Sequence, residues 1–88
     1  DLKGHLSGGK ILELNWNAIN KEKDMEAEVL VSFTNNIKVG GKDTYQKIGK
    51  VNIKEEKAAI PIKFPKNSDF VKVVLKTPNH TLNYWIYK

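Results

Sequence analysis

Apolar and polar residues alternate in several short stretches of this chain, and this period of two constrains the fold more than any other feature. In ILELNWNA, Leu12, Leu14 and Trp16 fall on one face and polar residues on the other. A strand with one buried face produces this pattern, whereas an amphipathic helix repeats every 3.6 residues. No stretch shows convincing helical periodicity, and residues 20–28 could form a helical turn at most. The sequence therefore predicts an all-β fold.

At least six short strands are predicted, about 10 to 14 residues apart and separated by Gly, Pro and Asn turns. They lie in residues 11–18, 28–35, 44–53, 58–64, 70–76 and 82–88. Gly49 is expected to mark a bulge or bend, and Pro61 an edge strand, because proline cannot donate a ladder hydrogen bond. Asn35, Asn36, Gly40 and Gly41 predict a turn. Such regular spacing is typical of a sandwich or a small barrel.

The apolar residues that these strands are expected to turn inward resemble those of a fibronectin type III domain, which is an immunoglobulin-like β-sandwich. The matching residues are Leu12, Leu14 and Trp16, then Val29, Val31 and Phe33, then Ile48, Gly49 and Val51, and finally Val71, Val73 and Leu75. The resemblance implies an antiparallel sandwich of about six to seven strands, with the third, penultimate and last strands side by side in one sheet. It departs from the family at Val71, where a Tyr is usual, and in the first strand, which has HLSGG in place of a proline-rich segment.

The 88 residues are expected to form one domain. Residues 10–88 are predicted to be the β-sandwich, and residues 1–9 a lead-in segment or a short first strand. The start at Asp1 without a Met favours a processed product or a segment of a longer protein. No apolar run approaches the roughly 18 residues that span a membrane.

The charge of +5 comes entirely from an excess of Lys, because all 15 basic residues are Lys. Two interpretations remain open: solvated lysines on strands and loops, or a basic binding surface. Arg, the residue best suited to reading bases and phosphates, is absent, which makes nucleic acid an unlikely partner. Cysteine is also absent, so disulfides and thiolate metal sites are excluded.

Catalytic and metal-binding patterns are not found in the sequence. His5 and His80 are far apart and belong to no ligand motif, and Glu55 and Glu56 lie in a lysine-rich turn. GGK occurs at 8–10 and 40–42 without the rest of a phosphate loop, and both are interpreted as turns. No enzymatic activity, cofactor or metal is predicted.

Three of the eight aromatic residues lie in the last five positions, in the segment NYWIYK. Two orientations of this strand compete. In one, Leu82, Tyr84 and Ile86 point inward and tie the terminus into the core; in the other, Trp85 and Tyr87 do. The first buries more aliphatic surface and is favoured. Trp85 and Tyr87 would then lie outside, next to Val74 and Leu30, as an exposed apolar strip of the kind that marks interaction surfaces.

These observations support three hypotheses. The leading one is a non-catalytic accessory module of a larger secreted or cell-surface bacterial protein, monomeric in isolation, which docks a neighbouring domain or partner. The second is a carbohydrate-binding module in which Trp85, Tyr87 and Tyr45 stack on sugar rings while Asn83 and Asn15 bind hydroxyls. The third is a small basic barrel that binds single-stranded nucleic acid.

Overall fold

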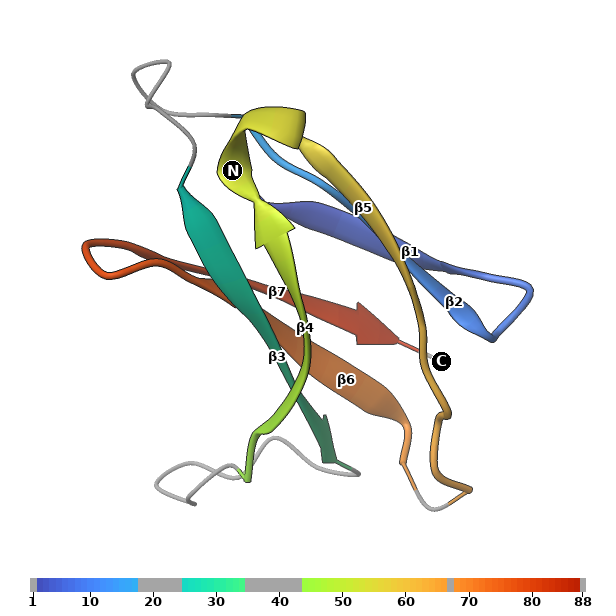
Figure 1. Cartoon of the computed structure of the whole chain (residues 1–88). Coiled ribbons are helices and arrows are strands. Elements are labelled where there is room, and N and C mark those ends of the chain that lie inside the picture. Colours follow the sequence, from blue (N-terminus) through green and yellow to red (C-terminus); the bar gives the residue numbers. More distant parts are fainter. Residues whose placement is uncertain (1, 18–24, 35–43, 67, 88) are drawn as a thin grey trace.

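The computed structural model describes residues 2–17, 25–34, 44–66 and 68–87. The turn predicted at Asn35, Asn36, Gly40 and Gly41, and most of the predicted helical turn, lie outside these residues. The described part contains seven strands and one 3-10 turn (Figure 1). They are β1 (Lys3–Ser7), β2 (Ile11–Asn15), β3 (Glu26–Thr34), β4 (Gln46–Asn52), the turn η2 (Ile53–Glu55), β5 (Lys57–Pro61), β6 (Phe70–Lys76) and β7 (Thr81–Tyr87).

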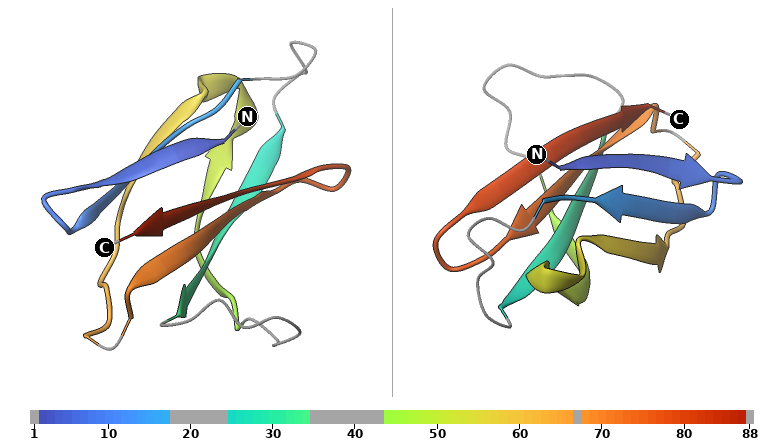
Figure 2. Two further views of the ribbon diagram at one scale, coloured as in Figure 1. Left: turned by 180° about the vertical axis from the view of Figure 1, so that it is seen from behind. Right: turned by 90° about the horizontal axis from the view of Figure 1, so that it is seen from above.

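The strands form two antiparallel sheets, one ordered β1-β2-β5 and the other β4-β3-β6-β7. Figure 2 shows the sheets as two layers, with β1 of one layer next to β7 of the other. The all-β prediction is confirmed, and so is the placing of β3, β6 and β7 side by side. No helix in the described ranges is long and apolar enough to cross a membrane.

One hydrophobic core lies between the sheets, and it is built from the alternating residues. Its fully buried side chains are Leu12, Leu14, Val29, Val31, Val71, Val73 and Leu75. The ladder between β3 and β6 places Val29 opposite Leu75 and Val31 opposite Val73. Side chains that are paired across two antiparallel strands point to the same face of the sheet, so these four stack as pairs against the other sheet.

Trp16 closes one end of the sandwich and joins the two layers. Its ring is buried, and its Nε1 donates a hydrogen bond of 2.8 Å to the carbonyl of Ile53 in η2. Its backbone N–H donates to the carbonyl of Glu56, and the N–H of Ile53 donates to the carbonyl of Met25, just before β3. The predicted core position of Trp16 is confirmed, and its indole N–H finds the partner that a buried Trp needs.

The N-terminal residues belong to the sandwich, because residues 3–7 form β1, which pairs with β2, and Leu2 is buried in the core. The GGK segment at 8–10 is the turn between the two strands. Gly8 and Gly9 have φ of 59° and 71°, and the N–H of Lys10 donates to the carbonyl of Ser7. Two consecutive positive φ values are sterically easy only for glycine.

The edge strands β4 and β5 have the irregularities that their sequences predict. The ladder between β3 and β4 shifts register where Val29 faces Gly49 and Leu30 faces Lys47, so the bulge lies beside Gly49. β5 is an edge strand, as Pro61 predicts, and it ends at that residue. It is therefore shorter than the predicted segment 58–64.

Candidate interaction surface

On each strand of the four-stranded sheet, the residues that alternate with the core residues point to the outer face. β6 lies between β3 and β7, so each outward residue of β6 has a neighbour on both sides. Lys72 lies between Ser32 and Trp85, and Val74 lies between Leu30 and Asn83. Phe70 is opposite Tyr87 at the end of the ladder. We call Tyr45, Phe70, Trp85 and Tyr87, with Lys72 among them, the aromatic strip.

The outer face of the other sheet has a different chemistry. Its outward residues are Lys3, His5, Ser7, Ile11, Glu13, Asn15, Lys57, Ala59 and Pro61. These are polar or small, with the exception of Ile11, and none is aromatic. Four aromatic side chains, Tyr45, Phe70, Trp85 and Tyr87, therefore gather on one outer face of the domain, and on β6 and β7 this follows from the alternation of the strands.

Phe70 is the support of the aromatic strip. It points away from the core, yet it is only 4% exposed. Its ring centroid lies 5.4 Å from that of Trp85 and 5.6 Å from that of Tyr87, with tilted planes in both pairs. Such tilted pairs contribute about 0.5–1.5 kcal/mol beyond the area they bury. A second packed layer thus covers part of the outside of the sheet and holds two rings in place.

The side chain of Lys72 lies between the rings of Trp85 and Tyr45. Its Nζ lies 5.1 Å from the centroid of the Trp85 ring and 5.8 Å from that of Tyr45. A cation over an aromatic face contributes about 0.5–1 kcal/mol at an exposed site and more where it is desolvated. Ser32, which is buried opposite Lys72 on β3, is small and leaves room for this arrangement. Lys72 therefore supplies positive charge within a surface that is otherwise aromatic.

The structure places all six predicted binding residues on this outer face, with differing exposure. Tyr87 is 69% exposed, and Tyr45 and Asn83 are also exposed, whereas Trp85 and Leu30 are partly buried. Val74 was expected to be part of an exposed strip, but its side chain is buried, because neighbours on both adjacent strands cover it. Asn15, the hydroxyl-binding candidate, lies on the other sheet and cannot join the strip.

The predicted orientation of β7 is correct, but one of its inward residues is not in the core. Ile86 belongs to the core and Leu82 packs against it, as expected. Tyr84 was also predicted in the core, and it is 36% exposed. The reason is its place on an edge strand: it lines an open hollow between β7 and β1, where Gly4 contributes no side chain.

The candidate binding residues proposed from the sequence did not include Phe70 and Lys72. The sequence already indicated their orientation, because Phe70, Lys72 and Val74 alternate with the core residues of β6 and therefore point to the outer face. The burial of Phe70 and the contacts of Lys72 could not be predicted from parity, since they depend on which residues of β7 and β4 lie opposite.

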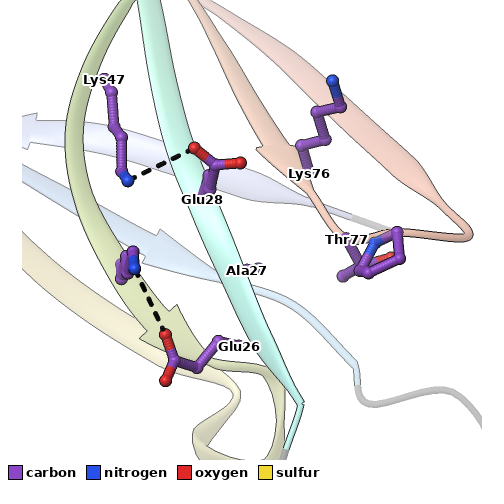
Figure 3. A pocket seen from close by; sticks show the side chains of 8 residues that line it. Glu26, Ala27, Glu28, Lys47, Lys76 and Thr77 are labelled. Carbon is purple, nitrogen blue, oxygen red and sulfur yellow. Dashed lines mark ion pairs between the residues drawn. The ribbon is translucent and has the colours of Figure 1, made fainter.

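A charged hollow of about 310 Å³ occupies the other end of the same outer face (Figure 3). Lys47 pairs with Glu28 at 3.4 Å and Lys50 with Glu26 at 3.9 Å, and Lys76 also lines the hollow. The side chains in these pairs are well exposed, so each pair contributes at most about 1 kcal/mol. Two of the three lysines around the hollow are thus paired with its two glutamates, which leaves an excess of one positive charge.

The histidines form no catalytic arrangement in the described ranges. His5 Nε2 lies 3.1 Å from Glu13 Oε2 in an exposed cross-strand pair, and His80 lies in the turn between β6 and β7. Within residues 2–17, 25–34, 44–66 and 68–87, no group of three or more His, Asp or Glu side chains could hold a metal ion.

The outer face thus combines aromatic rings on a buried support, one lysine among them and a charged hollow beside them. Aromatic side chains held in place in this way are typical anchors of binding interfaces. Comparisons with models of known protein families, with curated proteins and with solved structures found no match for this chain.

Proposed function

We propose that this chain is a non-catalytic interaction module that docks a neighbouring domain or a separate protein through its aromatic strip. The observation that carries the proposal is the packing of Trp85 and Tyr87 on the buried ring of Phe70, outside the core. A surface that is already ordered loses little side-chain entropy on binding, and aromatic residues dominate the binding energy of protein interfaces.

The proposal includes a fibronectin type III-like or related immunoglobulin-like architecture. It is supported by the adjacency of β3, β6 and β7 in one sheet and of β2 and β5 in the other. Modules with this architecture commonly serve as accessory domains, and we place this one in a larger secreted or cell-surface bacterial protein. This part of the proposal rests on the resemblance of the strand patterns and on a fold-level analogy.

Protein docking fits the geometry better than carbohydrate stacking does. A sugar ring stacks on an open aromatic face, and the Trp85 ring is partly buried, with the Lys72 ammonium over it and Phe70 against it. Tyr87 and Tyr45 have the open rings of the strip, and they lie at the end of β7 and next to β4, the two opposite edge strands of the sheet, so they do not form one platform. A mixed surface of rings, one cation and an exposed amide at Asn83 suits the varied chemistry of a protein partner.

Protein docking also fits better than single-stranded nucleic acid. That class of ligand needs a basic groove that tracks phosphates beside the stacking rings. Among the described lysines of this face, Lys47 and Lys50 are paired with glutamates, Lys76 lines the charged hollow, and Lys72 lies among the rings, so these lysines form no continuous groove beside the rings. Binding of a mixed-sequence oligonucleotide at physiological salt should therefore stay in the non-specific range, about 10⁻⁴ M or weaker.

The decisive experiment is site-specific photo-cross-linking in cells that produce the chain. A photoreactive phenylalanine analogue replaces Tyr87 or Tyr45 on the proposed surface, and Ala59 on the outer face of the other sheet as the matched control. Both surface positions should cross-link to one defined protein or neighbouring domain, and position 59 should not. Equal cross-linking from all three positions would contradict the proposal. Protection of Trp85 from acrylamide by a soluble glycan would favour the carbohydrate alternative.

A further inference from the structure

The edge of the sheet formed by β7 differs from the other three edges of the sandwich. An edge strand exposes unpaired backbone groups, and natural proteins protect such edges with charges, prolines, bulges or short strands. β4 has two lysines and a bulge, β5 has Lys57 and Pro61, and β1 is a five-residue strand that begins with Lys3. β7 has none of these features: its seven residues, TLNYWIY, include no charge and no proline.

The ladder of β7 is regular along its whole length. Every residue from Thr81 to Tyr87 has a partner on β6, without a register shift. Within the described part of the chain β6 is its one ladder partner, since β7 ends the order β4-β3-β6-β7. At about 3.3 Å per residue the free edge is about 23 Å long. An uncharged edge of this length with a regular ladder is a template for pairing with another strand.

A hollow of about 530 Å³ runs beneath this edge, between β7 and β1. Its lining includes the apolar side chains of Leu6, Phe64, Tyr84 and Ile86, Trp85 and Tyr87 from the aromatic strip, and His5 and Gly9 from the opposite sheet. Gly4 widens it because it has no side chain. The two sheets approach each other closely beside it: a Cβ on Gly4 would lie 3.2 Å from Ile86 Cδ1. Side chains of an added strand would alternate between this hollow and the aromatic strip, because successive residues of a strand point to opposite faces.

We propose that the free edge of β7 takes up an extended segment of a partner protein as an additional strand. Every second side chain of the segment is aliphatic and enters the hollow, and its centre contains no proline. Main-chain hydrogen bonds to β7 and pockets for alternate side chains are the general features of strand addition. The inference deepens the proposed function, on which it rests, by naming the kind of segment that β7 receives.

The charge around the edge indicates an acidic segment. Among the described residues that line the hollow none is acidic, and Lys72 lies in the row of Trp85, one strand in from the edge. The chain as a whole has a net charge of +5. Acidic side chains on the segment would meet a domain with an excess of lysines, and complementary charge of this kind favours one partner over others.

A second copy of the chain is a poorer occupant. Pairing two β7 edges would join strips about 23 Å long and about 10 Å deep, or roughly 230 Å² per copy, whereas a stable interface buries about 800 Å² per partner. A single extended segment gains more contact, because its side chains can enter the hollow below and cover the strip above. The hollow and the edge together therefore favour a segment over a dimer.

The test selects displayed random peptides, about twelve residues long to allow a strand with flanks, on the isolated domain. A Tyr84→Lys variant serves for counter-selection, since an inward-pointing charge is a natural protection of an edge strand. Tyr84 is partly exposed and lies outside the core, so the variant should fold, and its circular dichroism and melting curve check this. Ala59→Lys adds the same charge at an exposed position of β5 and is the matched control.

Enriched peptides should show apolar residues at alternate positions, excess acid and no central proline. A synthetic copy should bind Tyr84→Lys at least about tenfold more weakly than the parent and Ala59→Lys within about twofold, where tenfold is 1.4 kcal/mol. It should also slow hydrogen exchange of β7 amides. No enrichment, a helical spacing of the apolar residues, equal weakening by both lysines, or a dimeric parent in sedimentation would each overturn the inference. Tyr45 lies next to β4, at the edge of the sheet opposite β7. Cross-linking from Tyr45 would therefore still report docking by the aromatic strip, so the two proposals can fail separately.

Discussion

Replacing Phe70 by alanine tests whether the aromatic strip is a packed layer or a set of loose surface rings. Phe70 is 4% exposed and touches Trp85 and Tyr87. A large aromatic side chain buries about 150–250 Å², and truncation would return about 150 Å² of this to water. At about 25 cal/mol per Å², the loss is about 4 kcal/mol. Residual burial in the unfolded chain lowers the expected cost to about 3 kcal/mol.

The free energy of unfolding is measured by urea titration followed by circular dichroism. An 88-residue domain has about 4–13 kcal/mol in total, so a loss of about 3 kcal/mol is large but measurable. Tyr87→Ala is the matched control, because it removes a ring that is 69% exposed and rests on the same support; it should cost about 1 kcal/mol or less. If Phe70→Ala is no more destabilising than Tyr87→Ala, Phe70 supports nothing and the argument for an ordered strip fails.

Three further predictions concern packing, and each is measured by the same titration. Ile86→Ala should cost about 2 kcal/mol or more, whereas Tyr84→Ala should cost under about 1 kcal/mol because its ring is outside the core; equal costs would show that the edge is covered. Trp16→Phe should cost about 1–2 kcal/mol, because the hydrogen bond from the indole N–H to the carbonyl of Ile53 is lost, while that carbonyl still accepts from the N–H of Glu56. An unchanged free energy of unfolding would contradict this. Gly4→Ala should cost about 1–3 kcal/mol, because its Cβ would lie 2.8 Å from Leu14 Cδ2 in its own sheet and 3.2 Å from Ile86 Cδ1 in the other sheet. Gly49→Ala, whose Cβ would meet only an ordinary contact, should be much milder, and the reverse order would refute the close approach of the sheets.

Much of the fold could be predicted from the sequence, because alternation is a local property of the chain. The inward residues of β2, β3 and β6 are the ones the period of two indicates, and a one-residue slip would have placed all of them in water. Pro61 and Gly49 also act locally, through a missing N–H and a missing side chain, so the edge strand and the bulge could be placed in advance. The same parity argument separated Ile86 from Trp85 and Tyr87 on the last strand.

The tertiary structure alone decided how exposed each surface residue is. Parity assigns Phe70 and Val74 to the outside and Tyr84 to the inside, yet Phe70 and Val74 are buried and Tyr84 is partly exposed. Burial depends on what lies opposite: β6 has a strand on each side, whereas β7 has one on a single side and a hollow on the other. The sequence by itself determined which face each side chain takes, since that is set by the pleat. The order of the strands determined which of those side chains are covered, since a sheet protects its central strands and leaves its edges open.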